Sequence, residues 1–187
     1  MNQLLDYSAT YPADGILYRS STMILCAYFD AEFHNESKGR SRAGVHIFLS
    51  ENDPMPWWNG PVLTLSQIIK LVMSSASDAE MGVLFITAQE VAAMRNTLEE
   101  MRWPQKKSLI QTDNSETAGV VNITILTRKL KTMHQRLHWI KCREAQVQFR
   151  YYWASGSLNW GDYSNEHHLF LYHESKIIQF SGNPESI

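Results

Sequence analysis

The sequence predicts a single α/β domain with a mixed sheet whose later strands are reached through helices. The chain has 187 residues, and at roughly 100–200 residues per domain this length fits one domain. It is 44% hydrophobic and carries 7 Phe, 6 Trp and 8 Tyr, a composition typical of globular proteins and not of disordered chains. Three strand-like runs precede alternating helix-like and strand-like segments, an order that calls for helical crossovers.

Several protein classes are excluded by the pattern of apolar and cysteine residues. The longest clean apolar run covers residues 23–29, far short of the roughly 18 residues that a membrane span needs. Residues 1–6 have neither a basic n-region nor an apolar h-region, so no secretory signal is visible. Cys26 and Cys142 are the only cysteines, too few for a disulfide framework. We therefore expect an intracellular protein, in the cytoplasm or nucleus, without a membrane partner.

The first half of the chain holds three predicted strands. They span residues 22–29, 43–50 and 61–65. The first is almost wholly apolar, as expected of a strand buried on both faces, and it is expected to end at Asp30. Pro54 and Pro56 break the chain before the third strand, so the order predicts an antiparallel meander. A turn cluster at residues 11–15 separates a lead-in segment from these strands.

The second half alternates between helical and extended periodicity. A helix over residues 79–101 is the most regular, because Val83, Val91, Met94 and Leu98 recur on one face. The other predicted elements are a strand at 108–112, a short helix at 115–121, a helix at 127–145, a strand at 147–153 and a short helix around Asp162. Residues 169–187 form a tail.

Four acidic residues stand at comparable places in these elements. Asp30 and Asp113 follow strands, Glu80 opens the long helix, and Asp162 lies in the last short helix. Strand ends and helix starts converge on one rim of an α/β sheet, so these side chains can meet. Clustered carboxylates require cations, and hard oxygen ligands select Mg²⁺ or Mn²⁺. Each acid taken alone is better explained as a turn residue or a helix cap.

Local sequence around these acids resembles a known family. The blocks are residues 29–31, 73–80, 110–115, 133–139 and 159–163. They look like the ribonuclease H domain of copia-type retrotransposon polyproteins, in order along about residues 3–168. The serine-rich approach to Glu80 and the Thr-Asp-Asn-Ser block around Asp113 are its most specific parts.

The resemblance implies a ribonuclease H-like fold over residues 22–168, with three antiparallel strands, two more added through helical crossovers, and helices on both faces. It implies that residues 1–21 are the end of a connection from an upstream reverse transcriptase domain. It also implies hydrolysis of the RNA strand of RNA–DNA hybrids, with two Mg²⁺ ions, or Mn²⁺, held by Asp30, Glu80, Asp113 and Asp162. Asp78 is left out of this set, because positions i and i+2 of a helix do not share a face.

A basic stretch predicts where nucleic acid binds. Residues 127–150 hold seven basic residues and only one acid, Glu144, an asymmetry suited to phosphate contacts without base readout. The residues expected to bind nucleic acid are Lys38, Arg40, Arg42, Asn114, Arg128, Lys129, Lys131, Arg136, Lys141 and Arg143. An ordinary solvated helix face would show the same charges, and Asn114 would serve equally well as a turn residue.

Other functions stay open at this stage. The chain could be a catalytically silent module, domesticated from a retroelement, that binds hybrid or duplex. An integrase or resolvase of the same superfold is a second alternative, although such enzymes generally use three acids and lack the Thr-Asp-Asn-Ser block. His134 and His138 have the i, i+4 spacing of half a zinc site, but neither an intervening Glu nor a third ligand accompanies them.

Overall fold

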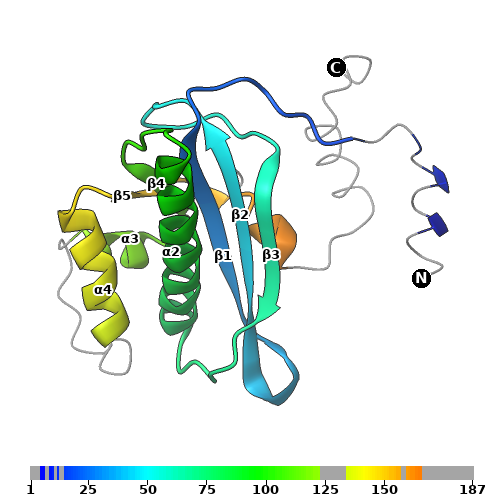
Figure 1. The fold of residues 1–187 in the computed structure, drawn as a ribbon. Coiled ribbons are helices and arrows are strands. Elements are labelled where there is room, and N and C mark those ends of the chain that lie inside the picture. The colour runs from blue at the N-terminus through cyan, green and yellow to red at the C-terminus, as the bar shows by residue number, and fades with distance from the viewer. Residues whose placement is uncertain are drawn as a thin grey trace.

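The computed structural model of the chain describes residues 5–6, 9–10, 12, 15–122, 134–156 and 159–165. Its centre is a five-stranded sheet with the strand order β3-β2-β1-β4-β5 (Figure 1). The strands are β1 (Ile24–Glu36), β2 (Arg40–Ser50), β3 (Pro61–Ile68), β4 (Ser108–Thr112) and β5 (Phe149–Trp153). β1, β2 and β3 pair antiparallel, whereas β4 pairs parallel to β1 and to β5.

The helices follow from the sequence pattern. They are α2 (Ala76–Glu100), α3 (Ser115–Val121), α4 (His134–Ala145) and two short 3-10 helices, η1 (Ser37–Gly39) and η4 (Asp162–Ser164). The predicted bounds of β4 and α3 are confirmed. The predicted helix at 127–145 is described only from His134 onward, because residues 123–133 lie outside the described part. No helix in the described ranges is long and apolar enough to cross a membrane.

The prediction that the first strand ends at Asp30 is wrong. β1 continues to Glu36, because its pairing with β2 runs on through Asp30↔Gly44, Ala31↔Ala43 and Glu32↔Arg42. Asp30 therefore lies inside a strand, at the point where the parallel partner β4 has already ended. The apolar run stops at this point because the strand is no longer fully buried from Asp30 onward, and not because the strand stops.

Other strand and helix boundaries differ from the prediction by two or three residues, and two of these differences have local reasons. α2 begins three residues earlier than expected, because the hydroxyl of Ser75 caps it by accepting a hydrogen bond from the Asp78 N–H at 3.1 Å. β5 begins two residues later, because Val147 adopts a left-handed φ of 62° in the turn that precedes the strand.

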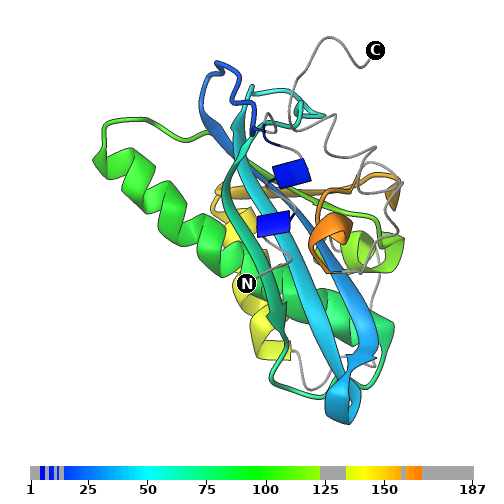
Figure 2. The same cartoon turned by 90° about the vertical axis from the view of Figure 1, so that its right-hand side faces the viewer.

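The sheet carries a different layer on each face. On one face, α2 and α4 cover a core that includes Leu25, Phe29 and Ile110, and Figure 2 shows both helices on the same side of the strands. On the other face, η4 packs on β1, β2 and β3, and Trp160 joins a second cluster with Tyr28 and Phe48. Alternating side chains of β1 feed both clusters, as expected of a central strand.

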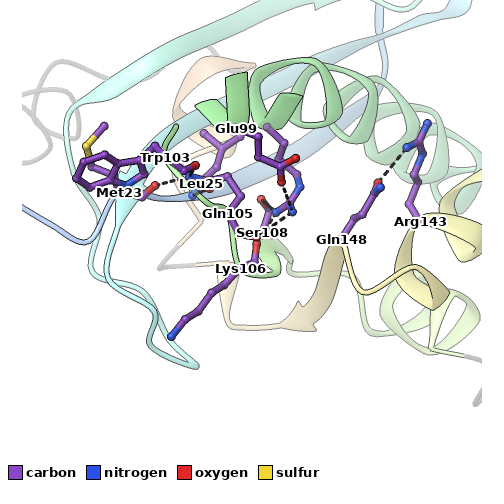
Figure 3. A network of polar contacts seen from close by, with 10 residues as sticks. Met23, Leu25, Glu99, Trp103, Gln105, Lys106, Ser108, Arg143 and Gln148 are labelled. Atoms are coloured by element: carbon purple, nitrogen blue, oxygen red, sulfur yellow. Dashed lines mark hydrogen bonds and ion pairs between the residues drawn. The ribbon is translucent and has the colours of Figure 1, made fainter. Parts of the chain in front are cut away.

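The loop from α2 into β4 is anchored by buried polar groups (Figure 3). Arg95 on α2 is 5% exposed, and its guanidinium donates to the carbonyls of Gln105 and Lys106 and to the Ser108 hydroxyl. The side-chain amide of Gln105 bonds the backbone of Met23, just before β1, and of Leu25 in β1. The start of β4 is therefore fixed against β1.

Candidate active site

The site lies where the chain changes direction in the sheet. From β1 the chain passes to β2 on one side and returns later to β4 on the other, so the carboxyl end of β4 beside β1 is a topological switch point, where crevices form in open α/β sheets. The register Cys26↔Leu109, Ala27↔Ile110 and Tyr28↔Gln111 extends by two residues to set Asp30 beside Asp113. The two carboxylates are thus brought together by strand pairing alone.

Glu80 reaches the same place from the helix. It lies in the second turn of α2, and its Oε1 accepts a hydrogen bond from the Ala31 N–H at 3.2 Å. Glu80 is 6% exposed, and its Oε2 is buried without a hydrogen-bond donor among the described residues. Asp30, Glu80 and Asp113 each offer a ligand oxygen, and these oxygens lie within 4.8 Å of one another.

The three carboxyls resist ionisation. Burial raises the pKa of Glu80 well above its ordinary value, and the charges of Asp30 and Asp113 raise it further. Burial also raises the pKa of Asp113, with a further rise from Asp30. For Asp30, burial is again the largest cause and Asp162 adds to it, whereas a hydrogen bond from Asn165 acts in the opposite direction.

This arrangement fits a divalent cation. The three carboxyl groups offer oxygen ligands, and one of these oxygens, Glu80 Oε2, is buried without a hydrogen-bond partner among the described residues. No basic side chain is among the causes that shift the three pKa values. A hard cation would supply the positive charge that these carboxylates lack, and oxygen ligands suit Mg²⁺ or Mn²⁺. Asp30, Glu80 and Asp113 are the residues that would hold it.

Asp162 approaches from the opposite layer. It opens η4 and is half-buried, and its charge raises the pKa of Asp30. It is not in the set of three whose oxygens lie within 4.8 Å of one another. The structure thus brings three of the four predicted acids into contact and sets the fourth on the Asp30 side of the group.

Two glycines allow the segment that carries Asp162 to pack closely against the sheet. A Cβ at Gly161 would lie 2.5 Å from the Phe29 carbonyl carbon and 2.7 Å from the Asp30 nitrogen. A Cβ at Gly44 would collide with the Gly161 carbonyl oxygen. Backbone therefore approaches backbone here, which only glycine permits.

Two asparagines at this end of the sheet were not predicted. Asn165 is 3% exposed, and its Nδ2 donates to Asp30 Oδ2 at 2.5 Å while its Oδ1 is buried without a described partner. Asn159 Nδ2 donates to the Phe29 carbonyl at 2.8 Å, and its side chain lowers the pKa of Asp113. Asparagines near Asp162 carry no sequence signal that links them to acids more than 40 residues away.

Five of the seven predicted nucleic-acid residues that the structure describes are engaged within the protein. Arg42 pairs with Glu36 at 2.5 Å, and Arg40 bonds Ser37. Asn114 caps α3 by accepting from the Thr117 N–H at 3.0 Å, the turn role that the sequence left open.

On α4, Arg143 lies over the Trp139 ring and donates to Gln148. Arg136 lies over the Phe85 ring, Lys141 is half-buried, and Lys38 is exposed in the η1 hairpin. Arg128, Lys129, Lys131 and the side chain of His134 lie outside the described residues. Asp78 takes no part in the acid group and accepts a hydrogen bond from Ser74.

No family model and no curated protein sequence matches the chain. Among solved structures, LC11-RNase H1, isolated from compost by a metagenomic approach, matches at a TM-score of 0.54 and 12% identity over 87% of this chain and 99% of its own. The same protein in complex with an RNA/DNA hybrid matches at 0.55 and 12% identity, over 73% and 88%. The N-terminal RNase H domain of a Mycobacterium tuberculosis protein matches at 0.52 and 10% identity, over 84% and 97%. The expected ribonuclease H-like α/β fold is therefore confirmed.

Proposed function

We propose that this chain is a metal-dependent ribonuclease H, of copia-type retroelement origin, that hydrolyses the RNA strand of RNA–DNA hybrids. The observation that carries the proposal is the group of Asp30, Glu80 and Asp113 at the switch point of a ribonuclease H-like sheet, with the buried Oε2 of Glu80 left without a donor. A structural neighbour with the same fold binds an RNA/DNA hybrid. The sequence blocks around the three acids supply the family assignment.

In the proposed mechanism, the four carboxylates together bind divalent cations at one place. By the resemblance, Asp30 would help to hold both of two divalent cations, Glu80 and Asp113 would complete the ligands of one, and Asp162 would hold the other. Two such ions would stabilise the attacking and leaving oxygens of an in-line phosphodiester displacement. The protein keeps the carboxylates on rigid strands and a helix, so that little reorganisation is needed during reaction.

Neighbouring groups hold these acids in position. The Ala31 N–H and the Asn165 amide each bind one carboxylate oxygen, which fixes how Glu80 and Asp30 are turned. Trp153 donates its indole N–H to the Asp113 carbonyl at 2.8 Å and so fixes the backbone of the third acid.

The function is tested by cleavage of a hybrid with labelled RNA, in Mg²⁺ and in EDTA. Asp30→Asn should reduce the rate by about 1,000-fold or more, equivalent to roughly 4 kcal/mol of lost transition-state stabilisation. The fold should be retained, because the substitution removes a charge that burial disfavours. Asp78→Asn is the matched control, since Asp78 is a buried acid on the same helix as Glu80 but lies outside the acid group.

Three results would separate the candidates. EDTA-sensitive cleavage in wild type and Asp78→Asn, absent in Asp30→Asn, supports the ribonuclease. Salt-sensitive hybrid binding without cleavage supports the silent module instead. Strand transfer on DNA–DNA duplex, with the hybrid left intact, would overturn the proposal in favour of an integrase-type enzyme.

A further inference from the structure

A groove lies at the opposite end of the sheet from the acid group. It consists of two neighbouring cavities of about 430 and 260 Å³ that share Asn52 and Lys106 in their walls. Trp103 lines the larger cavity, and Lys107 and Arg150 line the smaller. We call this feature the distal groove.

The distal groove is positively charged. Three cations line it, namely Lys106, Lys107 and Arg150, and all three are exposed. In the described part of the chain none of their side chains forms an ion pair or a hydrogen bond. Asp53 is the one acid in its wall, and its carboxylate accepts a hydrogen bond from the Met55 N–H at 2.9 Å. The groove therefore offers three cationic groups to a ligand.

An aromatic ring stands at the outer end of the groove. Trp103 is 43% exposed, and its indole N–H donates to the Thr22 carbonyl at 3.1 Å, which fixes the ring while leaving part of it open. An exposed aromatic beside cations is the combination that binds unpaired nucleotides, since every base can stack on a ring.

The groove is held rigid by the network of Figure 3. Arg95 and Gln105 fix the backbone of the loop from inside, while the Lys106 side chain extends away from the network. The cations therefore lie on a fixed backbone. Binding a ligand does not cost the conformational entropy of ordering this loop.

The groove and the acid group lie at the two ends of β4. Leu109 pairs with Arg150 and Gln111 pairs with Tyr152, and the Tyr152 hydroxyl bonds Gln111 Oε1 at 3.1 Å. Leu109 and Gln111 are buried, so a nucleic-acid strand that passes from one site to the other would run over the side chains that cover them. Asp113 follows Lys107 by six positions, or about 20 Å at about 3.3 Å per extended residue.

We propose that the distal groove binds a single-stranded nucleic-acid extension that continues from the hybrid held at the acid group. Cavities of 430 and 260 Å³ are at or below the lower end of small-ligand pockets, about 300–1,000 Å³. Volumes of this size suit the bases and phosphates of one strand. The cations contact phosphates and Trp103 stacks on a base. The inference rests on the proposed function in one respect: the duplex portion of the hybrid is taken to bind at the acid group.

The test compares binding of a blunt hybrid, the same hybrid with a single-stranded extension of about 10 nucleotides, and the free single strand. Binding is measured by fluorescence anisotropy in Mg²⁺ over a salt series, in an Asp30→Asn background that cannot cleave. Lys107→Glu should weaken binding of the extended hybrid and of the free strand by about 10-fold, and lower the salt slope by about 0.7 per lost phosphate contact. Blunt-hybrid binding should stay unchanged.

Two further variants control for charge and for stacking. Lys70→Glu makes the same change at an exposed lysine that lines a different cavity, beside α2, and should leave the preference for extended hybrid intact. Trp103→Ala should weaken extended-hybrid binding by about 10-fold, and Trp103→Phe should retain most of it, because the ring persists.

The outcomes decide the inference independently of the proposed function. If Lys107→Glu weakens blunt and extended hybrids equally, or acts no more strongly than Lys70→Glu, the groove does not bind the extension and the inference fails. If wild type never cleaves hybrid but binds the free strand through Lys107 and Trp103, the proposed function fails and the groove stands.

Discussion

At the residue scale, the acid group is surrounded by neutral donors. Asp30 binds the Asn165 amide, Glu80 binds the Ala31 N–H, and the side chain of Asn159 lowers the pKa of Asp113. These donors orient the carboxylates but do not neutralise them. Such outer partners of metal ligands set ligand orientation, and their loss typically reduces metal affinity or activity by about 10–100-fold.

The Asn165 amide should therefore control cation affinity. Asn165→Ala removes the donor to Asp30 Oδ2 and frees that carboxylate to rotate. We expect Mn²⁺ affinity, measured by titration with electron paramagnetic resonance, to fall by about 10–100-fold.

Asn59→Ala is the control for damage to a buried asparagine. Asn59 is 5% exposed and bonds Arg19 and Leu49, remote from the acid group. The Asn59→Ala variant should be less stable than wild type but should bind Mn²⁺ with the same affinity. Equal Mn²⁺ affinity in Asn165→Ala and wild type would show that Asn165 does not position Asp30.

At the element scale, the segment 159–165 depends on how closely it can approach β1 and β2. The approach is set by Gly161 against Phe29 and Asp30, and by Gly44 against Gly161. Asp162 and Asn165 reach the acid group only because this gap is small. The Trp-Gly-Asp order at residues 160–162 thus serves packing as well as chemistry.

Gly161→Ala should push this segment away from the sheet. The added methyl meets backbone atoms 2.5 Å away, which cannot move as a side chain can, and overpacking of this kind costs about 1–3 kcal/mol. We expect a lower unfolding temperature together with weaker Mn²⁺ binding. Gly15→Ala is the control, because no described atom outside its immediate chain neighbours lies within 4 Å of its added Cβ. A Gly161→Ala protein that matches Gly15→Ala in both measurements would contradict this account.

The basic helix shows where element-level prediction is incomplete. The sequence shows the basic residues in the range 134–145, but it does not show which side chains they contact. Arg136 and Arg143 lie over aromatic rings of α2 and α4, an arrangement that uses cations for packing. Their contribution to nucleic-acid binding remains a prediction.

At the scale of the whole molecule, the acid group should make stability depend on pH when no cation is bound. In the folded protein these three carboxyls bind protons more tightly than in the unfolded chain, whose Asp and Glu titrate near 3.9 and 4.3. Protonation therefore stabilises the folded state. This contribution is complete below about pH 4 and is lost as the pH rises through the raised pKa values.

Glu80→Gln is the variant that tests this linkage. In EDTA, its unfolding temperature relative to wild type should rise between about pH 4 and neutral pH, because the amide has no proton to lose. Every 1 kcal/mol gained corresponds to about 2–4 °C for a protein of this size. Mg²⁺ should raise the wild-type unfolding temperature at neutral pH and leave Glu80→Gln less affected. A difference between the two proteins that does not change with pH would refute the raised pKa of Glu80.

The sequence by itself determined the element order, the bounds of β4 and α3, and the acids that stand at strand ends and at the start of a helix. These features are local, because they depend on periodicity, caps and turns within a few residues. It also carried the resemblance that led to the ribonuclease H-like fold, now shared with three solved structures.

Only the tertiary structure decided how β1 runs past Asp30, that Asp30, Glu80 and Asp113 meet within 4.8 Å, and that Asn165 joins them. Each depends on strand register or on close approach between segments that are up to 135 residues apart in the chain. Such contacts leave no periodic signal, since no residue type or spacing records which distant backbone will lie beside it.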